Sequence, residues 1–188
     1  MLGKSMKRRA TYADIEALPE GVNGEILNGE LIVSPRPAPL HAQASSKLMG
    51  SLGGPFDDGN GGPGGWRILF EPELHLHGDV VIPDLAGWRR ERMPRLPKKA
   101  CFELPPDWVC EVLSPSTAAV DRAEKMSIYG REGVAHLWFV DPVLQTLEVF
   151  RRLEKGTWEV VANHRGAVQV RAEPFDALEL DLTRLWEP

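Results

Sequence analysis

Two carboxylates and one lysine in this sequence have the types and spacing that suit metal-assisted hydrolysis. Asp84 follows a proline directly, Glu111 lies inside a mostly apolar stretch, and Lys125 follows on a predicted helix. Hydrolysis of a phosphodiester needs relief of negative charge, a nucleophilic water and help for the leaving oxygen, which Mg²⁺ on hard oxygen ligands can supply. We therefore predict that Asp84 and Glu111 bind Mg²⁺, for which Mn²⁺ can substitute.

The same chemistry gives roles to two further side chains. An ammonium group on Lys125 would orient the water or stabilise developing charge, and Glu25 is a candidate third acid. The predicted catalytic residues are thus Asp84, Glu111, Lys125 and Glu25. Structural alternatives stay open: Asp84 could cap a turn, Glu111 and Lys125 could form a structural ion pair, and Glu25 could face solvent.

The elements that must hold these residues can be read from hydrophobic period and turn residues. Asn28-Gly29 between two short apolar runs predicts a hairpin of residues 25–27 and 30–33. Strands are predicted at 80–82, before Asp84, and at 108–113, around Glu111. A helix from Ser116 or Thr117 to about residue 131 would place Asp121, Lys125 and Tyr129 on one face; we expect Asp121 to cap or pair and Tyr129 to pack.

The remaining segments alternate between helix and strand. Helices are predicted at residues 11–18, opened by a capping box, and from residue 40 to about 52. Further strands are predicted at 136–140, 146–151 and 158–161. Residues 53–65, with seven glycines and two prolines, predict a mobile loop. Residues 66–77 are predicted to be extended, with a polar face of Glu71, Glu73, His75 and His77. Zinc on that face is a weaker alternative, because only neighbouring residues of one strand could share an ion.

Length and composition predict one domain over residues 1–188, with residues 1–10 as a disordered tail. The chain is 43% hydrophobic and contains two cysteines, too few for a disulfide framework. We find no signal-peptide pattern and no apolar run long enough for a membrane span, so a cytoplasmic location without membrane association is expected.

Charge is distributed unevenly although the formal net charge is only -5. Residues 89–99 contain six basic residues and one acid, and the N-terminal tail is also basic. A basic rim beside an acidic metal centre would suit a phosphate backbone, whereas solvated loop charge is the simpler reading. The candidate DNA contacts are Arg89, Arg90, Arg92, Arg95 and His41, and we expect this segment to begin near the metal centre because it follows Asp84 closely.

The joint pattern resembles the PD-(D/E)xK nuclease superfamily, and within it the Uma-type group of restriction-endonuclease-like proteins. The resemblance rests on Pro83-Asp84, the run Glu111 to Thr117, Asp121, Lys125 and Tyr129, together with the hairpin and Leu137 to Asp141. Leu113 stands where the superfamily has its lysine. The resemblance implies that Lys125 has taken over that role from the following helix.

These features predict an α/β domain with a PD-(D/E)xK restriction-endonuclease-like core, a central mixed sheet flanked by helices, and an N-terminal hairpin. The expected activity is Mg²⁺-dependent hydrolysis of DNA by an endonuclease. A non-catalytic module that binds nucleic acid or protein is one alternative, and a two-carboxylate glycosidase without metal is another. A homodimer is expected by analogy, because two-fold-related sites often cut both strands of a duplex.

Overall fold

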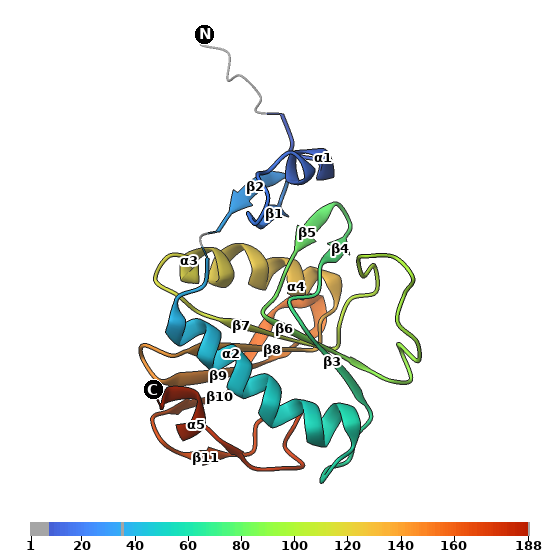
Figure 1. Ribbon diagram of the computed structural model, residues 1–188. Coiled ribbons are helices and arrows are strands. Elements are labelled where there is room, and N and C mark those ends of the chain that lie inside the picture. Colours follow the sequence, from blue (N-terminus) through green and yellow to red (C-terminus); the bar gives the residue numbers. More distant parts are fainter. Residues whose placement is uncertain (1–7, 35, 188) are drawn as a thin grey trace.

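The computed structural model describes residues 8–34 and 36–187, and its centre is a six-stranded mixed sheet (Figure 1). The strand order is β10-β9-β8-β7-β6-β3, and only β7 and β8 run parallel. A second, four-stranded sheet has the order β2-β1-β5-β4. The strands are β1 (Gly24–Leu27), β2 (Glu30–Val33), β3 (Trp66–Phe70), β4 (Leu74–Leu76), β5 (Asp79–Val81), β6 (Leu85–Arg89), β7 (Trp108–Val112), β8 (His136–Asp141), β9 (Thr146–Arg152), β10 (Trp158–Arg165), β11 (Gln169–Val170) and β12 (Leu180–Asp181).

The helices cover both faces of the central sheet, as predicted for a restriction-endonuclease-like core. They are α1 (Tyr12–Glu16), α2 (Pro39–Leu52), the π-helical turn η1 (Gly53–Asp58), α3 (Ala118–Val120), the π-helical turn η2 (Asp121–Lys125), α4 (Met126–Glu132), the 3-10 turn η3 (Glu154–Gly156) and α5 (Thr183–Trp186). In the described ranges, every helix is too short or too polar to cross a lipid bilayer.

Strand β7 lies between two hydrophobic clusters because its side chains alternate between the faces of the sheet. Trp108, Cys110 and Val112 pack in the cluster beneath α2, whereas Val109 and Leu113 pack in the cluster beneath α4. All five side chains are buried. Glu111, the one acid of this strand, therefore lies on a backbone that is fixed by packing on both faces of the sheet.

An aromatic cluster fixes the C-terminal segment against the sheet. Phe175 lies 4.8 Å from Phe56 and Trp66, 4.9 Å from Trp108 and 5.6 Å from Trp138, measured between ring centroids. The tilted and edge-to-face angles are those that aromatic pairs prefer. Residues that follow the central sheet in the sequence thus complete its core.

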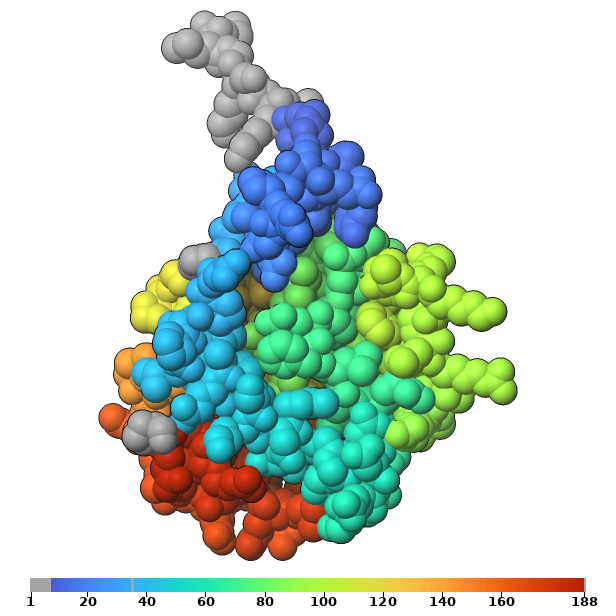
Figure 2. Space-filling model, viewed as in Figure 1, coloured from blue at the N-terminus to red at the C-terminus, as the bar shows by residue number. Residues whose placement is uncertain are grey.

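The N-terminal hairpin rises from the rounded body of the molecule (Figure 2). Its predicted register is confirmed, with Ile26 opposite Leu31 and the turn at Asn28 and Gly29 in the left-handed region. The capping box of α1 is present as well. Of the expected disordered tail, residues 1–7 lie outside the described residues, whereas residues 8–10 are held to the chain, since the Ala10 amide donates to the Gly29 carbonyl at 2.8 Å.

Two segments differ from the sequence prediction. Residues 53–58 continue α2 as η1 instead of starting a loop, and the Ile68 amide donates to the carboxylate of Asp57 at 3.0 Å. Residues 66–77 are not one extended strand, because Glu71 adopts a positive φ of 45° and separates β3 from β4. This break turns Glu71 away from the polar face predicted for it.

Candidate metal centre

Asp84 and Glu111 lie opposite each other on neighbouring antiparallel strands. Leu85 pairs with Cys110 in the register of β6 and β7, and one further step of that register brings Asp84 opposite Glu111. Directly opposed residues of an antiparallel pair have Cβ atoms about 4.5–5.5 Å apart. Both side chains line the same cavity, of about 310 Å³. The predicted pair of metal ligands is therefore brought together.

The carboxylate of Asp84 is held in place through both of its oxygens. Its Oδ2 accepts a hydrogen bond from the Val112 amide at 2.7 Å, and its Oδ1 lies 3.1 Å from Nε2 of His41. Burial lowers the pKa of His41, but the hydrogen bond and charge of Asp84 outweigh it, so the pKa is raised. His41, a predicted DNA contact, thus lies in the cavity, in the first turn of α2, and touches a candidate metal ligand.

Glu111 is held by two residues of the helix that follows its strand. The Tyr129 hydroxyl donates to Oε1 of Glu111 at 2.5 Å, and Nζ of Lys125 lies 3.4 Å from Oε2. Tyr129 is fully buried, and the prediction that it only packs was incomplete. The spacing of four residues placed Tyr129 on the correct face, but a phenol has both an apolar body and a polar tip, and the spacing does not show where the tip points.

Replacement of Tyr129 by phenylalanine tests how much the hydrogen bond from Tyr129 to Glu111 contributes to stability. We expect Tyr129→Phe to lower stability by about 1–3 kcal/mol, because a buried carboxylate loses its donor, and to lower Tm by about 2–4 °C per kcal/mol. Thermal unfolding followed by circular dichroism measures it. The chain has one other tyrosine, Tyr12, whose exposed hydroxyl contacts Glu73, and Tyr12→Phe is the matched control. Equal Tm values for the two variants would contradict the expectation.

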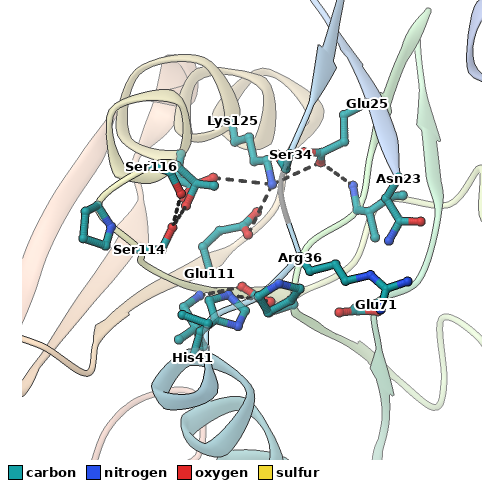
Figure 3. Close-up of a pocket in the computed structure, with 18 of the residues that line it drawn as sticks. Asn23, Glu25, Ser34, Arg36, His41, Glu71, Glu111, Ser114, Ser116 and Lys125 are labelled. Atoms are coloured by element: carbon teal, nitrogen blue, oxygen red, sulfur yellow. Dashed lines mark hydrogen bonds and ion pairs between the residues drawn. The ribbon is translucent and has the colours of Figure 1, made fainter. Parts of the chain in front are cut away.

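Lys125 is the centre of an ion-pair network that connects the hairpin to the helix (Figure 3). Its Nζ lies 3.0 Å from Glu25, 3.4 Å from Glu111 and 3.4 Å from Asp121. Glu25 also accepts a hydrogen bond from the Ile82 amide at 2.7 Å. The lysine therefore reaches Glu111 from the helix, as the resemblance implied, and Asp121 forms the expected pair with it.

Leu113, at the position where the superfamily carries lysine, is buried in the core beneath α4 and contributes no charge. The helix that brings Lys125 instead starts at Thr117, one of the two predicted N-cap residues, and continues through η2 and α4 to Gly133. Lys125 closes the π-helical turn, a distortion that is found frequently at functional positions.

Burial and mutual repulsion raise the pKa values of two carboxylates of the network, Glu111 and Asp121. Burial raises the pKa of Glu111 well above its usual range, and the charges of Asp121, Asp84 and Glu25 add to the rise while Lys125 opposes it. Burial likewise raises the pKa of Asp121. For Lys125, burial lowers the pKa, but the charges of Glu111, Glu25 and Asp121 outweigh it and raise the pKa. The lysine is therefore fixed as a cation.

The cavity carries more negative than positive charge, which suits a divalent cation. Its lining includes five carboxylates and two permanently charged bases, namely Glu25, Glu71, Asp84, Glu111, Asp121, Lys125 and Arg36. Within the described residues, no group of three or more His, Cys, Asp or Glu side chains could hold a metal ion alone. Mg²⁺ usually keeps several waters and needs one or two carboxylates. Asp84 and Glu111 therefore fit this ion better than they fit zinc, which prefers four protein ligands in structural sites.

Glu71 is a member of the cavity that the sequence did not reveal. Burial raises its pKa, and the charge of Asp84 adds to the rise. The other residues of the predicted polar face have local partners: His75 contacts Glu73 at 2.7 Å, and His77 contacts Glu132 at 2.5 Å. The alternating pattern of a continuous strand could not predict the break that separates Glu71 from them.

The basic segment of residues 89–99 lies at the opposite end of β6 from Asp84. Five strand residues span about 16 Å at roughly 3.3 Å per residue, and no residue of the segment lines the cavity. The expectation that it begins beside the metal centre is therefore wrong, because a strand, and not a turn, connects them. Arg89 stacks on Trp66 at 4.0 Å, whereas Arg90 and Arg92 pair with Asp57 and Asp107.

The central mixed sheet flanked by helices is a restriction-endonuclease-like fold. The chain belongs to the Uma2 family, described as "putative restriction endonuclease", whose model matches residues 10–183. The crystal structure of a "putative nuclease" from Anabaena variabilis ATCC 29413 is similar, with a TM-score of 0.75 and 22% identity over 94% of this chain and 97% of that chain. No curated protein matches the chain.

Proposed function

We propose that this chain is a Mg²⁺-dependent endonuclease that hydrolyses phosphodiester bonds of DNA. The observation that carries the proposal is the convergence of Asp84, Glu111 and Lys125 in one negatively charged cavity. A bound Mg²⁺ would supply charge neutralisation on the phosphate and a more acidic water. Membership of the family supports a nuclease, without specifying the metal or the nucleic acid.

The side chains of the cavity divide the remaining tasks. Asp84 and Glu111 hold the ion, and their orientation is kept by Val112 and Tyr129. Lys125 remains protonated among its three carboxylates and adds positive charge beside the position of the attacked phosphate. Glu25 fixes the lysine through its 3.0 Å contact, and in this role it positions a catalytic group without being an acid of the reaction.

A non-catalytic binding module is the second candidate, and one observation favours it. The ammonium group of Lys125 is shared among three carboxylates and is buried, so a substrate phosphate must compete with them for it. In that case the site would hold an ion for structural reasons, and the protein would bind nucleic acid at another surface. The two candidates share the fold and differ in turnover.

Cleavage of supercoiled plasmid separates these candidates. We expect nicked or linear DNA with Mg²⁺ or Mn²⁺ and no conversion with excess chelator, because the phosphate charge is then not neutralised. Retarded migration of a DNA duplex with Ca²⁺, without cleavage in Mg²⁺ or Mn²⁺, would favour the binding module. Hydrolysis of a glycoside in the presence of chelator would instead favour the metal-free carboxylate pair.

The basic segment predicts how DNA affinity depends on salt. If Arg89, Arg90, Arg92 and Arg95 each neutralise one phosphate, the slope of log affinity against log salt is about -3.6, from roughly -0.9 per phosphate. Replacement of all four by glutamine should flatten the slope to near zero, with a similar loss for unrelated sequences. Fluorescence anisotropy with Ca²⁺ measures it. An unchanged slope would mean that these four arginines do not neutralise phosphates.

A further inference from the structure

One cation that lines the cavity is free to bind a ligand. The ammonium group of Lys125 is already shared among three carboxylates, at 3.0 to 3.4 Å. The side chain of Arg36 also lines the cavity, and within the described residues it makes neither a hydrogen bond nor an ion pair. Unlike the lysine, the guanidinium group of Arg36 therefore has its donors available to a ligand.

The open end of the N-terminal hairpin brings Arg36 to the cavity. Because Gly24 pairs with Val33, the chain that precedes β1 and the chain that follows β2 leave the hairpin next to each other. Asn23 comes from the first of these segments and Arg36 from the second, and both line the cavity. Figure 3 shows both residues on the side of the cavity away from Ser114.

Arg36 and Asn23 lie at the mouth of the cavity, whereas the proposed metal ligands lie deeper. Asp84 is 9% exposed and Glu111 is 2% exposed, but Arg36 and Asn23 are both exposed. The guanidinium group rests against the backbone of Gly21, where a Cβ atom would lie 3.6 Å from Nη2 of Arg36. When one phosphate of a strand reaches the deep carboxylates, the next part of that strand therefore lies at the mouth.

The charge of the cavity gives a polyanion a reason to need this cation. The lining includes five carboxylates and two permanently charged bases, and the two positive charges of a bound Mg²⁺ would leave part of that formal excess. DNA carries one negative charge at each phosphate. A guanidinium group is suited to offset this charge, because its planar fork donates two parallel hydrogen bonds to phosphate oxygens.

We propose that Arg36 binds the backbone phosphate of DNA next to the phosphate that lies over Asp84 and Glu111, and that the amide of Asn23 donates to the same group. The inference rests on the proposed function, since that function supplies DNA as the ligand. Arg36 then contributes to the affinity for DNA and to the choice of the phosphodiester that is presented to the metal. A contact to phosphate does not read the bases, so it acts alike on all sequences.

Replacement of Arg36 by glutamine provides the first test. We expect Arg36→Gln to raise the dissociation constant for a fluorescein-labelled DNA duplex about 10- to 100-fold, measured by anisotropy with Ca²⁺, because a hydrogen-bonded charge contact is lost. Arg36→Lys should recover part of the affinity, since it keeps the charge and loses the fork. The matched control is Arg184→Gln, at an exposed arginine of α5 that does not line the cavity. Equal affinities of Arg36→Gln and wild type would overturn the proposal.

Metal binding separates contact with DNA from a structural role. If Arg36 only shaped the cavity, its replacement would weaken the binding of DNA and of Mn²⁺ together. We expect instead that Arg36→Gln binds Mn²⁺ as tightly as wild type or more tightly, because a positive charge beside the ion is removed. Weaker Mn²⁺ binding in isothermal titration would overturn the proposal.

A new charge at Asn23 provides a second test that does not change Arg36. Asn23→Asp should weaken DNA binding by repulsion of the phosphate, and unchanged affinity would overturn the position proposed for it. The wild-type chain separates this inference from the nuclease function. Cleavage by wild type, with equal DNA affinity in Arg36→Gln, would overturn only the role of Arg36. Weaker binding in Arg36→Gln, with no cleavage by wild type in Mg²⁺ or Mn²⁺, would support that role and overturn only the nuclease.

Discussion

Asp84→Asn and Glu111→Gln are each expected to lower metal-dependent cleavage of DNA at least a hundredfold. Each change removes the charge of one of the two proposed ligands while shape is nearly kept. Side chains that only orient a metal ligand are already worth about 10- to 100-fold, so the loss of a ligand should cost no less. Initial rates with Mg²⁺ measure the effect, and isothermal titration with Mn²⁺ should show lost binding.

The hydrogen bonds of the cavity can be kept by the amide side chains of both variants. In Asp84→Asn the new side chain keeps an oxygen that can accept from the Val112 amide, and in Glu111→Gln the Tyr129 hydroxyl can turn to accept from the new amide group. Glu179→Gln is the matched control, at an exposed acid that does not line the cavity. Cleavage at the wild-type rate in either ligand variant would contradict the assignment of the metal centre.

Glu111→Gln should also change the pH dependence of stability. The raised pKa of Glu111 means that the folded state holds a proton that the unfolded state releases. The stability of the wild-type chain therefore falls as pH rises from the ordinary glutamate pKa, about 4.3, to the raised value. Glutamine lacks this dependence, so the variant should gain relative to wild type over that window when no metal is present.

Lys125→Met is expected to lower the free energy of unfolding by about 3–5 kcal/mol. It leaves Glu25, Glu111 and Asp121 buried without their shared cation, and the loss of one partner from a buried ion pair typically costs this much. Tm should fall by about 6–20 °C, at about 2–4 °C per kcal/mol. Thermal unfolding of the metal-free chain measures it.

The pH dependence of this variant has a definite sign. The pKa of Lys125 is raised, so its stabilising charge is present throughout the range below the ordinary lysine pKa of about 10.4 and is lost only above it. In the variant, the deficit should shrink as pH falls and the freed carboxylates bind protons. Lys47→Met, at an exposed lysine of α2, is the control. An unchanged Tm in Lys125→Met would mean that the network contributes little to the fold.

The sequence predicted those parts of the site that depend on local spacing. Asp121, Lys125 and Tyr129 lie on one helical face because the helix period requires it, and the hairpin of Glu25 follows from its Asn-Gly turn. The position of Glu71 could not be predicted, because it depends on one residue with a positive φ. The prediction that the basic segment begins beside the metal centre was wrong, because even a few residues of extended strand separate two positions widely in space.

The proximity of a thiol to the metal centre has a consequence for oxidative damage. Cys110 precedes Glu111 on β7, and burial raises the pKa of its thiol well above the usual range, with added repulsion from Asp84 and Glu111. Oxidants attack the thiolate, and access to it is required. The half-buried Cys101, away from the cavity, is the more accessible thiol. Oxidation should therefore reach Cys101 first and spare the strand that carries Glu111.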